Sequence, residues 1–190
     1  MRYRTIATVA AAVLCCSAPA AAQVLTPTFQ APTSSNDIGI YVVDVGDLGV
    51  EGVLRRSLGA GDLGLRAGFA DVNDGNVLLL GVDYRNPLQL SGTAPLAIAF
   101  TVGAQAALLD AEVFGVQGGL SVGYAFVSPD LRLTPYIHPR LALVSSDDDT
   151  ELEVLADVGL DVGITPTLDL RFGANLGDGA DWGLGLAFRR

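Results

Sequence analysis

Hydrophobic and polar positions alternate with a period of two along most of this chain. In residues 96–108, the even-numbered positions are apolar and the odd-numbered positions are small or polar. This period is typical of β-strands, in which residues i and i+2 share a face. About ten such segments follow residue 36, and the connections between them are mostly short and rich in Gly, Asn, Asp and Pro. Because short turns join antiparallel neighbours, the pattern predicts an all-β, up-and-down meander.

The two faces of these segments differ in a way that favours a membrane-spanning barrel over a soluble sheet. The polar face has no lysine, and Gly, Ala and Ser recur there with isolated Arg and Asp. The opposite face is rich in Leu, Val and Phe, as a surface in contact with lipid would be. No apolar run after the start of the chain reaches the roughly 18 residues that a spanning helix needs. We therefore predict an antiparallel up-and-down transmembrane β-barrel over residues 37–190, with about ten strands or, as the alternative, eight.

The first 22 residues have the features of a secretory signal peptide. Arg2 and Arg4 precede an apolar stretch at residues 6–16, and the alanines at 20–22 suit cleavage after them. Cleavage would remove both cysteines of the chain, so no disulfide or zinc thiolate is expected afterwards. The next segment, residues 23–36, contains Pro, Thr and Ser and is expected to be an extended, poorly ordered leader.

The charge of the chain is strongly acidic and unevenly placed. The formal net charge is −10, with 11 basic and 21 acidic residues, which excludes a typical nucleic-acid-binding surface. Removal of Arg2 and Arg4 with the signal peptide would make it two units more negative. The odd-numbered connections between the expected strands carry most of the acids, namely Asp44, Asp47, Asp71, Asp74, Asp110, Glu112, Asp147, Asp148, Asp149, Glu151, Asp178 and Asp181. The even-numbered connections carry Asp62 and Asp130.

The last segment carries the spacing Asp181-x-Gly183-x-x-Leu186-x-Phe188. This spacing resembles the final strand of bacterial outer-membrane β-barrel proteins, which the barrel-insertion machinery recognises. The resemblance implies a barrel in outer-membrane lipid, with both termini on the periplasmic side and the acidic connections outside. We also expect the barrel to be a monomer. One departure is that Arg189 and Arg190 follow the aromatic residue, at which the family usually ends.

Charged residues on the polar face are expected to pair inside the barrel. An unpaired charge within a low-dielectric wall is costly, and the guanidinium of arginine suits paired hydrogen bonds to a carboxylate. The expected lumen network consists of Arg66, Asp83, Arg85, Arg132, His138, Arg140, Asp157, Asp161, Asp169 and Arg171. On the same stretch, Pro135 and Pro139 lack N–H groups that would face one neighbouring strand, which predicts a local bulge or a weakened pairing.

Chemistry beyond this network is weakly supported by the sequence. His138, the single histidine, would be the base of a lipid hydrolase only with a serine and an acid beside it, and nothing places Ser121 there. The Asp147–Asp149 run with Glu151 fits no EF-hand spacing for a divalent ion. We therefore expect no catalytic residue, metal site or cofactor, no nucleic-acid partner, and a structural or envelope role.

Two other functions stay open at this point. Small inward residues such as Gly103 and Gly119 leave room for a narrow pore or a small-solute passage along one wall. A soluble periplasmic calyx would instead turn the apolar face inward to bind lipid.

Overall fold

The structure, a computed structural model, describes residues 26–44, 48–72, 75–88, 95–109, 112–129, 131–146, 149–176 and 181–190. The expected signal peptide, residues 1–22, lies outside these ranges. No helix among the described residues has the length and apolar character to cross a membrane.

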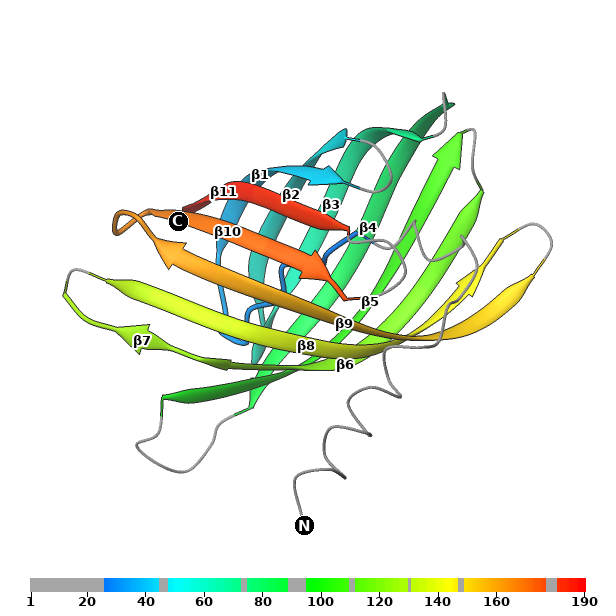
Figure 1. Cartoon of the computed structure of the whole chain (residues 1–190). Coiled ribbons are helices and arrows are strands. Elements are labelled where there is room, and N and C mark those ends of the chain that lie inside the picture. Colours follow the sequence, from blue (N-terminus) through cyan, green and yellow to red (C-terminus); the bar gives the residue numbers. More distant parts are fainter. Residues whose placement is uncertain are drawn as a thin grey trace, which may run out of the picture.

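The described chain forms one antiparallel sheet that closes on itself (Figure 1). The strands are β1 (Asp37–Asp44), β2 (Leu48–Leu58), β3 (Gly61–Val72), β4 (Gly75–Leu88), β5 (Leu96–Leu109), β6 (Val113–Tyr124), β7 (Phe126–Val127), β8 (Arg132–Ser145), β9 (Thr150–Gly163), β10 (Leu168–Asn175) and β11 (Trp182–Arg189). Each strand pairs with the next except that β6 and β7 both pair with β8, and β1 pairs with β11 from Asp37 opposite Arg189 to Asp44 opposite Trp182.

β6 and β7 are two parts of one strand, because both pair with β8 in the same register and only Ala125 separates them. The ring is therefore a closed barrel of ten strands. The predictions of an all-β up-and-down barrel and of about ten strands are confirmed.

The apolar face of the strands points outward. Ile40, Phe69 and Val154 are 66%, 64% and 78% exposed, whereas Asp37 and Arg55, on the opposite parity of their strands, are 0% and 1% exposed. Strict alternation of buried and exposed residues along β1 and β11 shows the same arrangement. The described barrel therefore does not turn the apolar face of its strands inward, as the soluble calyx would, although one buried apolar cluster surrounds Phe29 and Tyr41.

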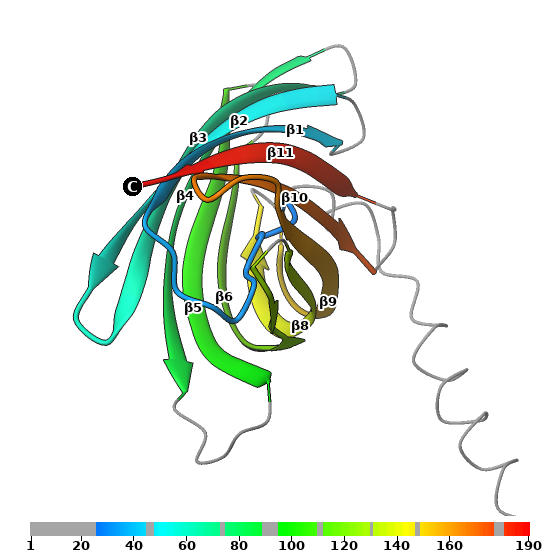
Figure 2. The ribbon, with the colours of Figure 1, turned by 90° about the vertical axis from the view of Figure 1, so that its left-hand side faces the viewer.

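The leader enters the lumen. Figure 2 looks into the barrel from the end that holds the C-terminus and shows the leader inside the ring of strands. Thr26, Thr28, Phe29, Gln30 and Ala31 are all buried although they belong to no strand. The composition of this segment predicts poor order, but the barrel wall around residues 26–31 buries them and holds them in place.

The two prolines of β8 interrupt a ladder without shifting it. The β6–β8 pairing lacks the partners Leu120 and Ser121 opposite Pro139 and His138, and resumes in the same register at Val122 opposite Ile137. The pairing of β8 with β9 is continuous from Arg132 to Ser145. The expected weakening is therefore present on the β6 side, but the expected bulge is not.

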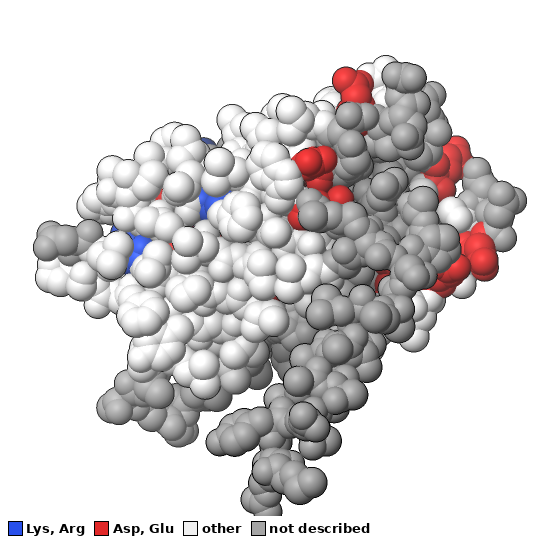
Figure 3. Space-filling model, viewed as in Figure 1, with Lys and Arg blue, Asp and Glu red and all other residues white. Residues whose placement is uncertain are grey.

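Charges of opposite sign lie toward opposite ends of the barrel (Figure 3). Of the acids assigned to the odd-numbered connections, Glu112, Asp149 and Asp181 lie in the described parts of those connections, and Asp44, Asp71 and Glu151 lie at the strand ends beside them. Asp47, Asp74, Asp110, Asp130, Asp147, Asp148 and Asp178 lie outside the described residues. The other end carries Arg56, Arg132, Arg189 and Arg190. One assignment was wrong: Asp62 belongs to β3, not to a turn, and is fully buried in the lumen.

Candidate functional site in the barrel lumen

The lumen holds the ten charged residues that the sequence assigned to it. Nine of them are buried, and Arg132 is half-buried at the start of β8. They come from β3, β4, β8, β9 and β10, whose inward positions are fixed by strand parity. Because these strands surround one narrow space, residues that are far apart in sequence meet across it.

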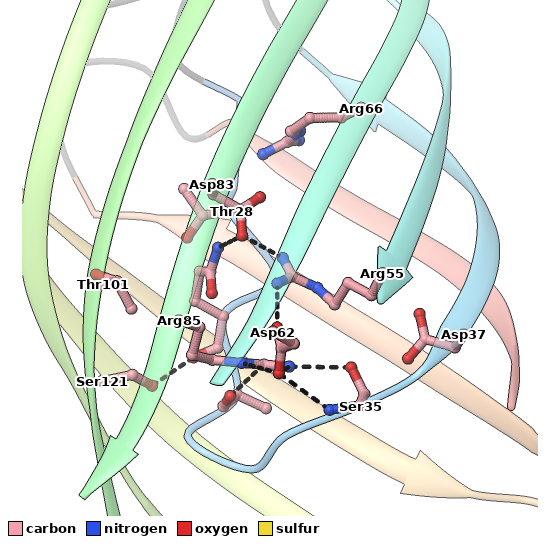
Figure 4. A network of polar contacts seen from close by, with 12 residues as sticks. Thr28, Ser35, Asp37, Arg55, Asp62, Arg66, Asp83, Arg85, Thr101 and Ser121 are labelled. Carbon is pink, nitrogen blue, oxygen red and sulfur yellow. Dashed lines mark hydrogen bonds and ion pairs between the residues drawn. The ribbon is translucent and has the colours of Figure 1, made fainter. Parts of the chain in front are cut away.

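Arg55 of β2 joins two carboxylates on neighbouring strands (Figure 4). Its Nη1 lies 2.9 Å from Asp62 Oδ1, and its Nη2 lies 2.8 Å from Asp83 Oδ1 on β4. Arg85 also bonds Asp62, with Nη2 and Nε at 2.9 and 3.2 Å from Oδ2. All four side chains are nearly inaccessible, so each charge depends on its partners.

A second pair lies farther along the lumen. Arg66 donates two hydrogen bonds to Glu51 of β2, from Nε at 2.6 Å and from Nη2 at 2.5 Å. This is the bidentate arrangement that favours arginine over lysine.

A third group surrounds Arg171 of β10. Its Nη2 lies 2.6 Å from Asp37 Oδ2, its Nε lies 3.2 Å from Asp161 Oδ2, and its Nη1 donates to the Tyr41 hydroxyl at 3.1 Å. Asp37 and Tyr41 belong to β1, so this group ties the two sides of the barrel closure together. Asp169, next to it, accepts from Arg132 at 2.8 Å and from Arg189.

His138 sits between hydroxyl groups and a carboxylate. Its Nε2 lies 2.7 Å from Thr101 Oγ1, and its Nδ1 lies 2.9 Å from Thr28 Oγ1 and 3.3 Å from Asp157 Oδ2. Arg140 completes the group, with Nη2 donating to Asp157 Oδ1 at 3.0 Å. The row of hydroxyl, imidazole and carboxylate is typical of nucleophilic catalysis, but these side chains are all buried and the leader covers them.

The serine that the hydrolase hypothesis would need is engaged elsewhere. Ser121 Oγ donates to the backbone carbonyl of Gln30 in the leader. Thr101, which the sequence did not single out, is the hydroxyl residue beside His138 Nε2.

The space left by small residues of β5 and β6 is filled. A Cβ atom at Gly119 would lie 2.9 Å from His138 Nε2 and 2.8 Å from Arg140 Cβ, and one at Gly103 would lie 3.1 Å from Asp83 Cβ. Large side chains of neighbouring strands therefore lie against the two glycines beside which a narrow passage was left open as an alternative. The small residues serve to accommodate them.

Four charged lumen residues were missed from the sequence. Asp37, Glu51 and Arg55 lie on β1 and β2, where the alternation is least regular, and Asp62 follows a Gly-Ala-Gly run that suggested a longer turn. In the clearer strands, alternate residues point inward. Continuing this alternation through the short turns places these four residues on the inward face as well, and this could have identified them.

The C-terminal motif has two sides. Leu186 and Phe188 point outward and are exposed, whereas Gly183 points inward against the Phe29 ring of the leader. Asp181, just before β11, is buried; burial first, and then the nearby carboxylate of Asp44, raise the pKa of Asp181 to about 7.

Among the described residues, no group of three or more His, Cys, Asp or Glu side chains is arranged to hold a metal ion. Two acids of the rim run, Asp147 and Asp148, lie outside these residues.

Comparisons with known proteins give similarity at the level of structure alone. No protein-family model and no curated protein matches the chain. A structure from "De novo design of transmembrane beta-barrels" is similar at 17% identity, over 83% of this chain and 98% of that chain, with a TM-score of 0.43. KdgM porin is similar at 10% identity, over 81% of this chain and 99% of that chain, with a TM-score of 0.47. A bacterial polysaccharide outer membrane secretin is similar at 12% identity, over 75% and 56% of the two chains, with a TM-score of 0.45. The solved structures that the chain resembles thus include a porin, an outer-membrane secretin and a designed transmembrane barrel.

Proposed function

We propose that the chain is an integral outer-membrane β-barrel with a closed lumen and a structural or envelope role, without catalysis. The observation that carries this proposal is the filling of the lumen. Ion pairs join β2 to β3 and β4, β1 to β10, and β8 to β9, and the leader occupies the space between them. A lumen packed in this way stiffens the barrel and leaves little room for a solute.

The surface of the barrel supports the membrane part of the proposal. Large apolar side chains are exposed on every long strand, in positions where water would make them unfavourable and lipid would not. Closure of the sheet between β1 and β11 gives each of the ten described strands, with β6 and β7 counted as one, a paired neighbour on both sides, as the hydrocarbon layer requires.

Absence of catalysis is proposed because the group most like a catalytic centre is covered. Thr28 of the leader hydrogen-bonds both His138 and Asp157, so it occupies the space in which a substrate would have to lie.

Membrane fractionation and conductance test this proposal together. We expect the protein in the outer-membrane fraction, with the heat-modifiable gel migration of a folded barrel, and no steady current when the intact protein is inserted in a planar bilayer. Recovery from the soluble periplasm would contradict the membrane assignment.

A narrow pore is the second candidate. It is favoured by one observation: a short, uncharged segment, residues 26–36, fills the lumen, and this segment is not a separate folded domain. Steady single-channel currents from the intact protein would support the pore and contradict the closed lumen.

A further inference from the structure

The leader is held in the lumen through its backbone. It belongs to no helix or strand, so its buried carbonyl groups need other donors. Side chains of the wall supply them: Arg66 Nη2 donates to the carbonyl of Pro27 at 3.1 Å, and Ser121 and Arg85 donate to the carbonyls of Gln30 and Ala31.

The wall also recognises side chains of the leader. The Phe29 ring packs against the Tyr41 ring, with centroids 4.3 Å apart, and faces Gly173 and Gly183, which have no side chain to exclude it. Gln30 Nε2 donates to Asp83 Oδ1 at 2.5 Å. Thr28 Oγ1 donates to Asp157 Oδ2 at 2.8 Å.

The backbone of the leader is fitted to this site. Phe29 adopts a φ of 49°, in the left-handed region that an aromatic residue avoids unless its surroundings compensate. Pro27 and Pro32 restrict the chain on either side, which lowers the entropy lost on binding.

The ionic balance of the wall does not depend on the leader. Residues 26–36 carry no charge. The arginines that hold them already have carboxylate partners on the barrel, Arg66 with Glu51 and Arg85 with Asp62. The site would therefore stay electrically paired if the leader left it.

We infer that the lumen is a binding site for an uncharged polypeptide segment without helix or strand structure and with an aromatic residue, and that residues 26–36 are its built-in ligand. The same segment supplied as a separate peptide then binds a barrel that lacks its own leader. This inference deepens the proposed function, because it assigns a ligand class to the same lumen.

The test uses a variant of the full chain that lacks residues 26–34 and a synthetic peptide of residues 26–36. The dye is attached at the Asn36 end of the peptide, which lies at the rim beside Arg190. Folding of the variant is checked first by heat-modifiable migration, and binding is then measured by fluorescence anisotropy in detergent. We expect saturable binding to the truncated barrel and none to the intact protein, whose site is occupied.

Two control peptides define specificity. A peptide with the same residues in scrambled order, and one with Phe29→Ala and Gln30→Ala, should each bind at least about tenfold more weakly. Equal binding of all three peptides, or no binding to a folded truncated barrel, overturns the inference.

If the truncated chain does not fold alone, refolding in the presence of the peptide becomes the measurement. Recovery of the heat-modifiable form with the peptide of residues 26–36, and not with the scrambled peptide, supports the inference; recovery with neither overturns it. Binding is measured without ion flow, so a current through the intact barrel would contradict the closed lumen and leave this result standing.

Discussion

At the scale of single residues, glycines decide which large side chains fit inside the barrel. Tyr41 lies over Gly39 and Gly185, where added Cβ atoms would come within 2.6 and 2.3 Å of its ring. Tyr136 covers Gly159 in the same way, at 2.1 Å. The glycine-rich inward faces are therefore the complement of the aromatic residues and the leader.

Gly183→Ala should loosen the leader. The added Cβ would lie 2.5 Å from Phe29 Cζ, so the ring has to move, and such overpacking costs roughly 1–3 kcal/mol. We expect the free energy of unfolding to fall by about this amount, measured as the loss of the heat-modifiable form in urea. Gly52→Ala is the matched control, because its Cβ would point outward with the nearest atom, the Ala67 carbonyl oxygen, 3.7 Å away. An equal loss in both variants would contradict the role given to Gly183.

Arg55 and Arg56 are adjacent in sequence but differ in environment. Arg55→Leu would leave the buried carboxylates of Asp62 and Asp83 without one of their partners, which typically costs roughly 3–5 kcal/mol. Arg56→Leu removes an exposed charge near the end of β2, and its effect should be within about 0.5 kcal/mol. Urea titrations of both variants in the same detergent give the comparison. Similar losses for the two would show that the buried network does not stabilise the barrel.

Asp181 should make stability depend on pH. Its pKa in the folded protein is about 7 against an ordinary value of 3.8, so the folded state binds this proton more tightly than the unfolded state. The resulting stabilisation is complete at low pH and is lost as pH rises from about 4 to about 7. Asp181→Asn should remove this part of the pH profile of the unfolding midpoint, and Asp71→Asn, at an exposed rim position, should leave it. An unchanged profile in Asp181→Asn would contradict the assignment.

Parity along the chain was enough to place ten charged residues toward the lumen, because a strand puts alternate residues on one face whatever its neighbours are. It could not give their partners. Arg55 meets Asp83 across β3, and Asp37 meets Arg171 across the closure, and both contacts depend on how the sheet curves and closes. Pairing inside a barrel is a non-local property, so it required the structure.

At the scale of elements, β8 has one strong and one weak edge. Pro135 and Pro139 leave the ladder to β6 incomplete, while the ladder to β9 is continuous. We expect the backbone amides of Leu120 and Val122 on β6 to exchange with deuterium at least about tenfold faster than those of Asp157 and Gly159 on β9. Residue-resolved hydrogen exchange in detergent micelles measures this. Equal protection on both sides of β8 would show that the prolines do not weaken the pairing.

The position of the leader in the lumen is the feature at this scale that the sequence did not predict. Its Pro, Thr and Ser residues gave no periodic pattern, and such a composition is common in disordered segments. Its order depends on donors such as Arg85 and Ser121, which lie 54 and 91 positions away from their acceptors in the chain. Local patterns therefore identified the strands and could not identify the segment that fills the space between them.

At the scale of the whole molecule, the apolar residues and the charged residues of this acidic chain lie in different parts of the barrel. Apolar residues cover the outside of the wall, most of the charges inside it are paired, and most of the described acids outside the lumen are at one end (Figure 3). A fold with one lipid-facing side on every strand was predictable, since period two and short turns are local features. The same separation predicts how the outer surface responds to a charge.

An arginine on the outer face should be costly in proportion to its depth in the bilayer. Val102 lies midway along β5 and points outward, so Val102→Arg should lower the free energy of unfolding by roughly 2–4 kcal/mol in lipid vesicles. Leu48, the first residue of β2, is exposed at the rim, and Leu48→Arg should cost roughly 0–1 kcal/mol. Urea titrations of both variants in phosphatidylcholine vesicles give the comparison. The titrations are repeated in detergent, where the depth of a residue in a bilayer matters less. Equal costs at the two positions in vesicles would contradict a hydrocarbon layer around the middle of the barrel, because only such a layer distinguishes the centre of a strand from its end.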